Sequence, residues 1–448
     1  MCIHNLDGTD CPYCATKESI CLPDTDLPRL VIIGGGFAGL ALVEGLKDQN
    51  IQVVLIDRNN FHQFQPLLYQ VATSGLEPDS ILFPFRKQIS GYKNVIFRMA
   101  DVTEVQTPTK TIITNNGALK YDFLVLATGT ASNYFGLNQL QEQSLGLKDI
   151  RDALNIRHRM LENLEQAAIT CDEKEQDALT NFVIVGGGPA GVEMAGALAE
   201  FCKYIVPKDY PEYSSSLMKI FLVEASDKIL PLMSEKASSR SLQYLRNQNV
   251  EVLLNEAVVG YDGSTVTTQS SKEISSKNVI WTAGVQGQFP KGCAAPNMIT
   301  RGNRIKVNEF LQIAGSDHVF ALGDMAAMIT KETPNGHPQV AQPAIQQGRY
   351  LASILVNIIQ KRPIKPFTYQ DKGSLTTVGK RKAVADIGKF HFAGYIAWLL
   401  WSLVHIRSIA GFKNKLIVGL SWALSYFSFD KSSRLIIKDI EISKDHSD

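Results

Sequence analysis

Apolar runs that end in glycine-rich turns occur twice along the chain and predict its architecture. Residues 29–39 read RLVIIGGGFAG, and residues 181–191 read NFVIVGGGPAG. Each run is followed by a helical pattern, Leu40–Leu46 in the first case and Val192–Phe201 in the second. The pattern therefore predicts a strand, a tight turn and a helix at two places in the chain.

Further apolar runs follow each of these turns. The first copy continues into the run 51–56, which ends at Asp57, and the second continues into 219–223, which ends at Glu224. Strands alternating with helices indicate parallel sheets that helices cover on both faces. Other extended runs lie at 121–129, 278–284 and 319–322. We therefore expect an α/β fold.

The order of these runs predicts two Rossmann-like dinucleotide-binding domains, one inserted in the other. Residues 29–150 and 288–360 form the first domain, and residues 151–287 form the inserted one. Residues 1–28 are a polar, Cys-containing N-terminal tail. Residues 361–448 differ in composition and form a C-terminal helical module.

Composition and charge narrow the class of protein. Of the 448 residues, 45% are hydrophobic, which excludes a disordered chain. Lys and Arg number 45 against 44 Asp and Glu, and this balance argues against a general nucleic-acid-binding surface. The first 28 residues have no secretory apolar core, which favours a reducing cytosol. No apolar run reaches the roughly 18–20 residues of a membrane-spanning helix.

The first glycine turn has the spacing of a pyrophosphate-binding motif. Gly34 permits the turn, Gly36 lets the pyrophosphate approach the backbone, and Gly39 lets the helix pack on the strand. The phosphates then lie at the positive end of the helix dipole. Asp57, 23 residues after Gly34, is close to the spacing of a ribose-binding acid.

The second turn repeats this pattern with Gly186, Gly188 and Gly191, and its acid is Glu224. Two such turns on one chain imply two dinucleotides. An acid at each ribose favours a free 2′-hydroxyl over a 2′-phosphate, and hence NADH over NADPH. Two dinucleotides on one protein usually exchange a hydride between a nicotinamide and a flavin.

The sequence resembles the two-dinucleotide-binding flavoproteins and, among them, the type II NADH dehydrogenases, which are non-proton-pumping NADH:quinone oxidoreductases. The resemblance covers about residues 29–430. It rests on FHQFQPLLYQVA at 61–72, ATG at 127–129, ALGDMA at 321–326, AQPAIQ at 341–346 and the aromatic C-terminal region.

The resemblance implies two cofactors, FAD and NADH, and no metal. The residues it assigns to FAD are Gly34, Gly36, Phe37, Ala38, Gly39, Asp57, Thr128, Gly129, Asp324 and Gln342. Those it assigns to NADH are Gly186, Gly188, Gly191, Glu193, Glu224 and Gly284. It also places Glu193 near the nicotinamide, and it places Gln342 and Gln346 at the site of a quinone, either menaquinone or ubiquinone.

Two apolar runs near the C-terminus, 392–404 and 416–427, include three of the four tryptophans. No acidic residue lies between Lys389 and Phe429, whereas several basic residues do. Short apolar helices with flanking cations and aromatic residues suit a membrane surface. We therefore expect residues 389–429 to bind the cytoplasmic side of the inner (plasma) membrane peripherally. A homodimer interface or a core helical hairpin remains an alternative for the same runs.

The positions of the cysteines help to distinguish between classes of reductase that use different electron acceptors. The region 60–76 lacks the cysteine pair of disulfide reductases. A sulfide:quinone-type reductase would need redox cysteines near the flavin, and the segment 324–347 contains no cysteine. The alternatives left open are a soluble NAD(P)H-dependent flavin reductase with another acceptor, a sulfide:quinone-type reductase and, outside enzymes, a redox-sensing flavoprotein. Four of the seven cysteines cluster in the tail, for which we favour free thiols over a zinc site: Cys2, Cys11, Cys14 and Cys21.

Overall fold

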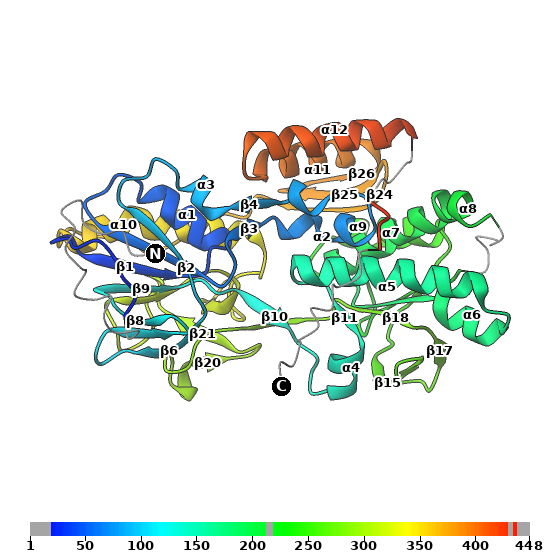
Figure 1. The fold of residues 1–448 in the computed structure, drawn as a ribbon, viewed down its shortest axis with the longest axis horizontal. Coiled ribbons are helices and arrows are strands. Elements are labelled where there is room, and N and C mark those ends of the chain that lie inside the picture. Colours follow the sequence, from blue (N-terminus) through cyan, green and yellow to red (C-terminus); the bar gives the residue numbers. More distant parts are fainter. Residues whose placement is uncertain (1–18, 212–217, 429–432, 437–448) are drawn as a thin grey trace, which may run out of the picture. The chain divides into compact units, whose positions relative to one another are not determined.

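The computed structural model describes residues 19–211, 218–428 and 433–436 (Figure 1). Its contacts divide the chain into two compact units. The first unit contains the described residues up to Gln63, together with Leu82–Asn133 and Val285–Lys372. The second contains Phe64–Ile81, Tyr134–Gly284 and the described residues from Gly373 onward.

A parallel five-stranded sheet forms the centre of the first unit. Its strand order is β22 (Val319–Ala321), β9 (Phe123–Leu126), β1 (Arg29–Ile33), β2 (Gln52–Asp57) and β5 (Val95–Met99). All four strand pairs are parallel. The central strand β1 is buried from Leu30 to Ile33, because helices and loops cover both faces of a parallel sheet.

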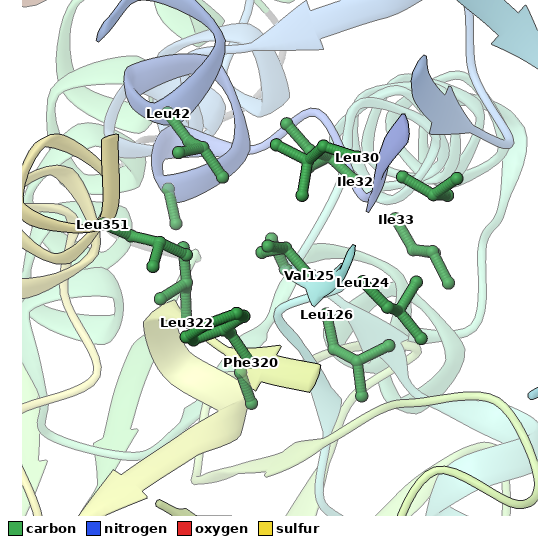
Figure 2. Close-up of a cluster of buried hydrophobic side chains, with 14 of the residues drawn as sticks. Leu30, Ile32, Ile33, Leu42, Leu124, Val125, Leu126, Phe320, Leu322 and Leu351 are labelled. Atoms are coloured by element: carbon green, nitrogen blue, oxygen red, sulfur yellow. The ribbon is translucent and has the colours of Figure 1, made fainter. Parts of the chain in front are cut away.

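Two helices pack together beside this sheet, α1 (Phe37–Gly45) and α10 (Ala341–Ile359). Figure 2 shows Leu42 of α1 and Leu351 of α10 in one cluster with side chains of β1, β9 and β22. A Cβ atom on Gly45 would lie 2.4 Å from the Cβ of Ala352, so the two helices approach closely. This packing fixes the helix that follows the first glycine turn.

Smaller elements complete the first unit. After β22 and Leu322 comes the 3₁₀ turn η4 (Gly323–Met325), which leads into β23 (Ala326–Met328). The smaller sheets are β6–β7–β8 (Val102–Gln106, Thr111–Thr114, Gly117–Lys120), β20–β21–β23 (Ile299–Thr300, Arg304–Val307, Ala326–Met328), β10–β19 (Thr130–Ser132, Val285–Gly287) and β3–β4 (Phe61–Gln63, Leu82–Pro84).

The second unit contains another parallel five-stranded sheet. Its order is β11 (Leu145–Gly146), β18 (Asn278–Trp281), β12 (Phe182–Val185), β13 (Ile220–Val223) and β14 (Val250–Leu253). A small antiparallel sheet, β15–β16–β17, spans Val258–Tyr261, Thr265–Thr268 and Glu273–Ser275. The helices of this part are α2 (Leu68–Ala72), α4 (Asn138–Gln143), α5 (Ile150–Ile169), α6 (Glu173–Thr180), α7 (Pro189–Tyr204), α8 (Val206–Asp209) and α9 (Glu235–Arg246).

The C-terminal module also belongs to the second unit. It consists of an antiparallel sheet, β24 (Ser374–Gly379), β25 (Lys382–Ile387) and β26 (Phe390–Ala393), and the helices α11 (Tyr395–Ser408) and α12 (Phe412–Ser428). Strand β24 packs on α7, where a Cβ on Gly196 would lie 2.4 Å from the carbonyl oxygen of Val378. Within the described part of the chain, we find no helix with the length and apolar character needed to cross a bilayer.

These observations confirm the predicted α/β fold with two dinucleotide-type sheets and a C-terminal module. The compact units nevertheless group the chain differently from the four expected segments. Residues 64–81 join the inserted nucleotide domain because α2 packs on α5 and α7. Residues 361–372, expected in the C-terminal module, belong to the first unit.

Candidate dinucleotide sites

The first glycine turn lies between β1 and α1. Gly34 has φ of +104°, and a Cβ there would be 2.4 Å from the carbonyl oxygen of Ala127. A Cβ on Gly39 would be 2.0 Å from the carbonyl oxygen of Gly34, whereas one on Gly36 would meet nothing within 4 Å. Gly36 is also the N-cap of α1 and offers no side-chain hydrogen bond to the helix. The turn therefore presents open space and uncapped N–H groups, as a pyrophosphate requires.

The carboxylate of Asp57 closes the same turn. Its Oδ2 accepts a hydrogen bond of 2.7 Å from the N–H of Gly35, and its Oδ1 accepts one of 2.8 Å from the N–H of Asn59. Burial raises the pKa of Asp57, although both N–H donors oppose that shift. The acid at the end of β2 thus has a structural task in addition to the ribose contact expected from its position.

Three other residues assigned to FAD lie at the ends of neighbouring strands, whereas Phe37 and Ala38 lie in α1 and Gln342 lies on α10. Thr128 and Gly129 follow β9, and Asp324 lies in the turn η4 after β22. The Thr128 hydroxyl donates to the carbonyl oxygen of Gln288 and approaches the sulfur of Met325. Because β22, β9 and β1 are parallel neighbours, their carboxyl ends bring these residues to the same sheet edge as Gly34.

The second glycine turn, between β12 and α7, reproduces the geometry of the first. Gly186 has φ of +108°, and a Cβ there would be 2.8 Å from the backbone of Ala283. A Cβ on Gly191 would be 1.9 Å from the carbonyl oxygen of Gly186, but one on Gly188 would meet nothing within 4 Å. Gly188 caps α7 without a side-chain hydrogen bond, and Pro189 begins the helix. A second dinucleotide fits this turn as the first fits its counterpart.

Glu224 corresponds to Asp57 in the second turn. Its Oε2 accepts a hydrogen bond from the N–H of Gly187, and its Oε1 accepts from the N–H and the hydroxyl of Ser226, at 2.8 and 2.6 Å. Gly284 follows β18 with φ of +82°, and a Cβ there would be 2.6 Å from the ring of Phe135. Glu224 therefore borders the second turn, and Gly284 directly follows Ala283, whose backbone approaches Gly186.

Glu193 lies on α7, but its side chain is buried within the second unit. Thr377 of β24 offers its N–H to Oε1 at 3.5 Å. Burial raises the pKa of Glu193 to about 8, while the Thr377 N–H and the Trp401 indole oppose the shift. The carboxyl group is therefore mostly neutral at pH 7 and packs against the C-terminal module. The resemblance implied a position near the nicotinamide for Glu193, and its burial comes from contacts that are distant in the chain.

Gln342 and Gln346 lie one turn apart near the start of α10. The Oε1 of Gln342 accepts from the N–H of Lys372 at 3.2 Å. The Nε2 of Gln346 donates to the carbonyl oxygen of Gln370 at 2.8 Å, and the Oε1 of Gln346 accepts from the N–H of Gln370 at 3.0 Å. The helix begins at Ala341 with Pro343 in its first turn. Both glutamines thus hold the segment that leads toward β24.

A third glutamine on this helix, Gln347, was not among the predicted site residues. Gln347 is fully buried, and its Oε1 accepts from the N–H of Gly323 at 2.7 Å. Gln339 donates from Nε2 to the carbonyl oxygen of Asp324 at 3.0 Å. The only signal in the sequence was that a second glutamine follows Gln346 directly, which does not reveal its partner.

Four cysteines lie in the described part of the chain. Cys171 is exposed, Cys202 is buried in α7, and Cys21 is half-buried. Cys293 is buried, and burial raises its pKa to about 12, so it is an unreactive thiol at neutral pH. The tail residues Cys2, Cys11 and Cys14 lie outside the described residues.

The fold and its two open glycine turns define a reductase that holds two dinucleotides. The family model described as pyridine nucleotide-disulphide oxidoreductase matches residues 28–348, and the model described as NDH2 C-terminal domain matches residues 372–428. A relative in Mycobacterium tuberculosis, the type II NADH:quinone oxidoreductase Ndh, is 35% identical over 92% of this chain and 90% of its own length. The chain belongs to the pyridine nucleotide-disulphide oxidoreductase family and, within it, to the type II NADH:quinone oxidoreductases.

Other comparisons agree with this assignment. The type II NADH:quinone oxidoreductase of Staphylococcus saprophyticus is 27% identical over 86% of this chain and 96% of its own length. The structure of NDH2 from Plasmodium falciparum in complex with NADH matches with a TM-score of 0.83 at 23% identity, covering 92% of this chain and all of that one. The sulfide:quinone oxidoreductase of Aquifex aeolicus has the same fold at a TM-score of 0.70 and 17% identity, covering 87% and 92%.

Proposed function

We propose that the chain transfers a hydride from NADH to FAD and then passes two electrons to a quinone, without moving ions across the membrane. Membership of the type II NADH:quinone oxidoreductases supports this reaction, and the repeated open turn at Gly36 and Gly188 is the structural observation that carries it. The alternatives of a soluble flavin reductase, a sulfide:quinone-type reductase and a redox sensor are less favoured by these relatives.

The residues around the two turns are proposed to bind and orient the cofactors. The first turn, with Asp57, Thr128, Gly129 and Asp324, would hold FAD, and the second, with Glu224 and Gly284, would hold NADH. When bound, FAD would supply the acceptor for the hydride and the source of the two electrons that pass to the quinone. Glu224, the acid at the ribose position of the second turn, also favours NADH over NADPH.

Gln342 and Gln346 are proposed to border the quinone. Both are half-buried on α10, and both use side-chain amides, which interact with carbonyl oxygens without introducing charge into an apolar pocket. Their bonds to the backbone of 370–372 would then orient the amides for the quinone as well as hold that segment.

An anaerobic titration tests the reaction in its two halves. NADH should bleach the bound flavin, and a soluble quinone should restore its colour. Gln342→Leu should leave bleaching by NADH unchanged and slow the return of colour with quinone. Purified protein that binds no FAD, or a reduced flavin that quinone cannot reoxidise, would contradict the proposal.

A membrane surface is the proposed partner of the C-terminal module. On α12, Phe412, Leu416, Leu420 and Leu424 recur at every fourth residue and are 81%, 59%, 58% and 62% exposed. This spacing aligns them on one face of the helix. The neighbouring helix α11 also exposes apolar residues: Tyr395, Ile396, Leu399, Leu403 and Val404.

Charge favours a lipid surface as the occupant of this face. Arg407 and Lys413 are exposed and Lys415 is half-buried, while the sequence holds no acid from Lys389 to Phe429. Trp401, expected at the membrane, is instead buried and stacks on His405, so aliphatic side chains form most of the exposed surface. We place this surface on the cytoplasmic side of the inner (plasma) membrane, where NADH is available.

Flotation with vesicles containing anionic phospholipid tests the membrane proposal. The double variant Leu416→Asp/Leu420→Asp should lose vesicle binding, whereas Leu232→Asp, at an 81% exposed site on the same unit, should retain it. High salt should weaken binding because the cations contribute. If the double variant floats normally but changes from dimer to monomer in sedimentation, the face is a homodimer interface instead.

A further inference from the structure

The turn η4 presents Asp324, but it has few backbone hydrogen bonds of its own. Before the turn, the N–H of Leu322 donates to the carbonyl oxygen of Leu126. At the end of the turn, the N–H of Ala326 donates to the carbonyl oxygen of Gly323. Gly323 itself has φ of +72°, a conformation that most residues avoid. A turn of this kind needs support from outside to keep one orientation.

Two glutamine side chains supply that support within the first unit. The Oε1 of Gln347 accepts from the N–H of Gly323 at 2.7 Å, and the Nε2 of Gln339 donates to the carbonyl oxygen of Asp324 at 3.0 Å. Gln347 is 1% exposed, so water cannot replace its oxygen as the acceptor. The peptide groups on both sides of the Gly323–Asp324 bond are therefore held by side chains.

A buried cation holds the exit from the turn. The guanidinium of Arg304 donates to the carbonyl oxygens of Ala326, Asn335 and His337, and the contacts to Asn335 and His337 are 2.9 and 3.0 Å long. Among the described residues, no carboxylate lies within salt-bridge distance of it. Burial lowers the pKa of Arg304, and the charge of Asp324 opposes that shift, so the two charges interact across the turn.

We propose that Gln347 is a positioning residue for the flavin: with Gln339 and Arg304, it fixes the Gly323–Asp324 turn so that Asp324 meets the cofactor. This inference rests on the proposed binding of FAD at the first glycine turn. It differs from the proposed role of Gln342 and Gln346, because Gln347 bonds to the flavin turn and they bond to residues 370–372.

The affinity of the apoprotein for FAD tests this role, measured by the quenching of FAD fluorescence on binding. Gln347→Met keeps the length of the side chain but removes the acceptor for Gly323. It should weaken FAD binding at least about tenfold, which corresponds to about 1.4 kcal/mol. Gln347→Glu keeps an acceptor oxygen and should restore most of the affinity. The visible circular dichroism of the bound flavin should change in the Met variant and return in the Glu variant.

Gln52→Met is the matched control. Gln52 is also a buried glutamine of the first unit, 6% exposed, and its amide bonds to Pro23 and Arg29 rather than to the turn. It should lower stability without changing the affinity for FAD. If Gln347→Met does not fold, the partly exposed Gln339→Leu provides the same test through Asp324.

The outcomes separate this inference from the proposed function. If the wild-type protein binds FAD and both Gln347→Met and Gln339→Leu bind it equally tightly, the positioning role is refuted. If Gln52→Met and Gln347→Met weaken binding to the same degree, the effect is general destabilisation and the role is also refuted. Wild-type protein that binds no FAD would refute the proposed function itself.

Discussion

Replacing Glu193 with Gln should change how stability depends on pH. In the folded protein burial raises the pKa of Glu193 to about 8, from an ordinary value of 4.5. Well below pH 4.5 the carboxyl group is neutral in both the folded and the unfolded chain. Its burial then does not lower the free energy of unfolding through ionisation. Between pH 4.5 and 8 the unfolded chain releases the proton while the folded chain retains it, so folding stability falls as the pH rises.

The magnitude follows from the size of the shift. A shift of one pKa unit corresponds to about 1.4 kcal/mol, so the full cost above pH 8 is about 5 kcal/mol. From pH 6 to pH 8, the part of the cost that develops is about 2 kcal/mol. The amide side chain in Glu193→Gln would be neutral at every pH and could still accept from the N–H of Thr377. The variant should therefore gain stability relative to the wild type as the pH rises.

Chemical unfolding at pH 6, 7 and 8, with wild type and variant measured side by side, checks this prediction. The difference in unfolding free energy should widen by about 2 kcal/mol over the range. Glu142→Gln, an exposed position on α4, serves as the control and should give a constant difference. If the curves for Glu193→Gln and wild type stay parallel, Glu193 ionises normally in the folded protein and the account of its burial is wrong.

Four further predictions concern the turns and the C-terminal module. Gly34→Ala should destabilise the apoprotein by about 2 kcal/mol or more, because φ of +104° is strained for alanine and its Cβ would meet the carbonyl of Ala127. Gly36→Ala, with open space around its Cβ, should leave the Tm of the apoprotein unchanged and weaken only FAD binding, which fluorescence titration measures. Glu224→Gln should lower the ratio of KM for NADPH to KM for NADH about tenfold, and an unchanged ratio would remove Glu224 from ribose selection. Burial lowers the pKa of His405 to about 4 from 6.5, so stability should fall as the pH drops from 6.5 to 4, by about 3 kcal/mol at most, and His405→Gln should remove that loss in acid unfolding experiments.

The glycine turns were predictable because their information is local. A buried strand, three glycines at fixed spacing and a helix occupy fewer than about 20 consecutive residues, and the acid lies at the end of the next strand. The structure shows the same close approaches at Gly34 and Gly186, at Gly39 and Gly191, and open space at Gly36 and Gly188. Steric requirements on the backbone leave a direct trace in the sequence.

The surroundings of Glu193 and Gln347 were not predictable in this way. Glu193 is buried by Thr377 and Trp401, which lie about two hundred residues further along the chain. The helix α11 is apolar on most of its surface, so its sequence does not show that Trp401 turns inward while Leu403 is exposed. Only the packing of β24 and α11 against the rest of their unit decides which side chains are covered.

The helix α10 shows why defects in quinone reduction need a backbone control. Gln342 accepts from the N–H of Lys372, so Gln342→Leu would release that segment as well as remove an amide from the proposed quinone site. Lys372→Pro separates the two effects, because it removes the N–H and leaves the side chain of Gln342 intact. If Gln342 contacts the quinone, Gln342→Leu should raise the KM for quinone and Lys372→Pro should raise it much less. Equal defects in the two variants would show that Gln342 acts by holding the chain, and the assignment of the quinone to this face of α10 would then be wrong.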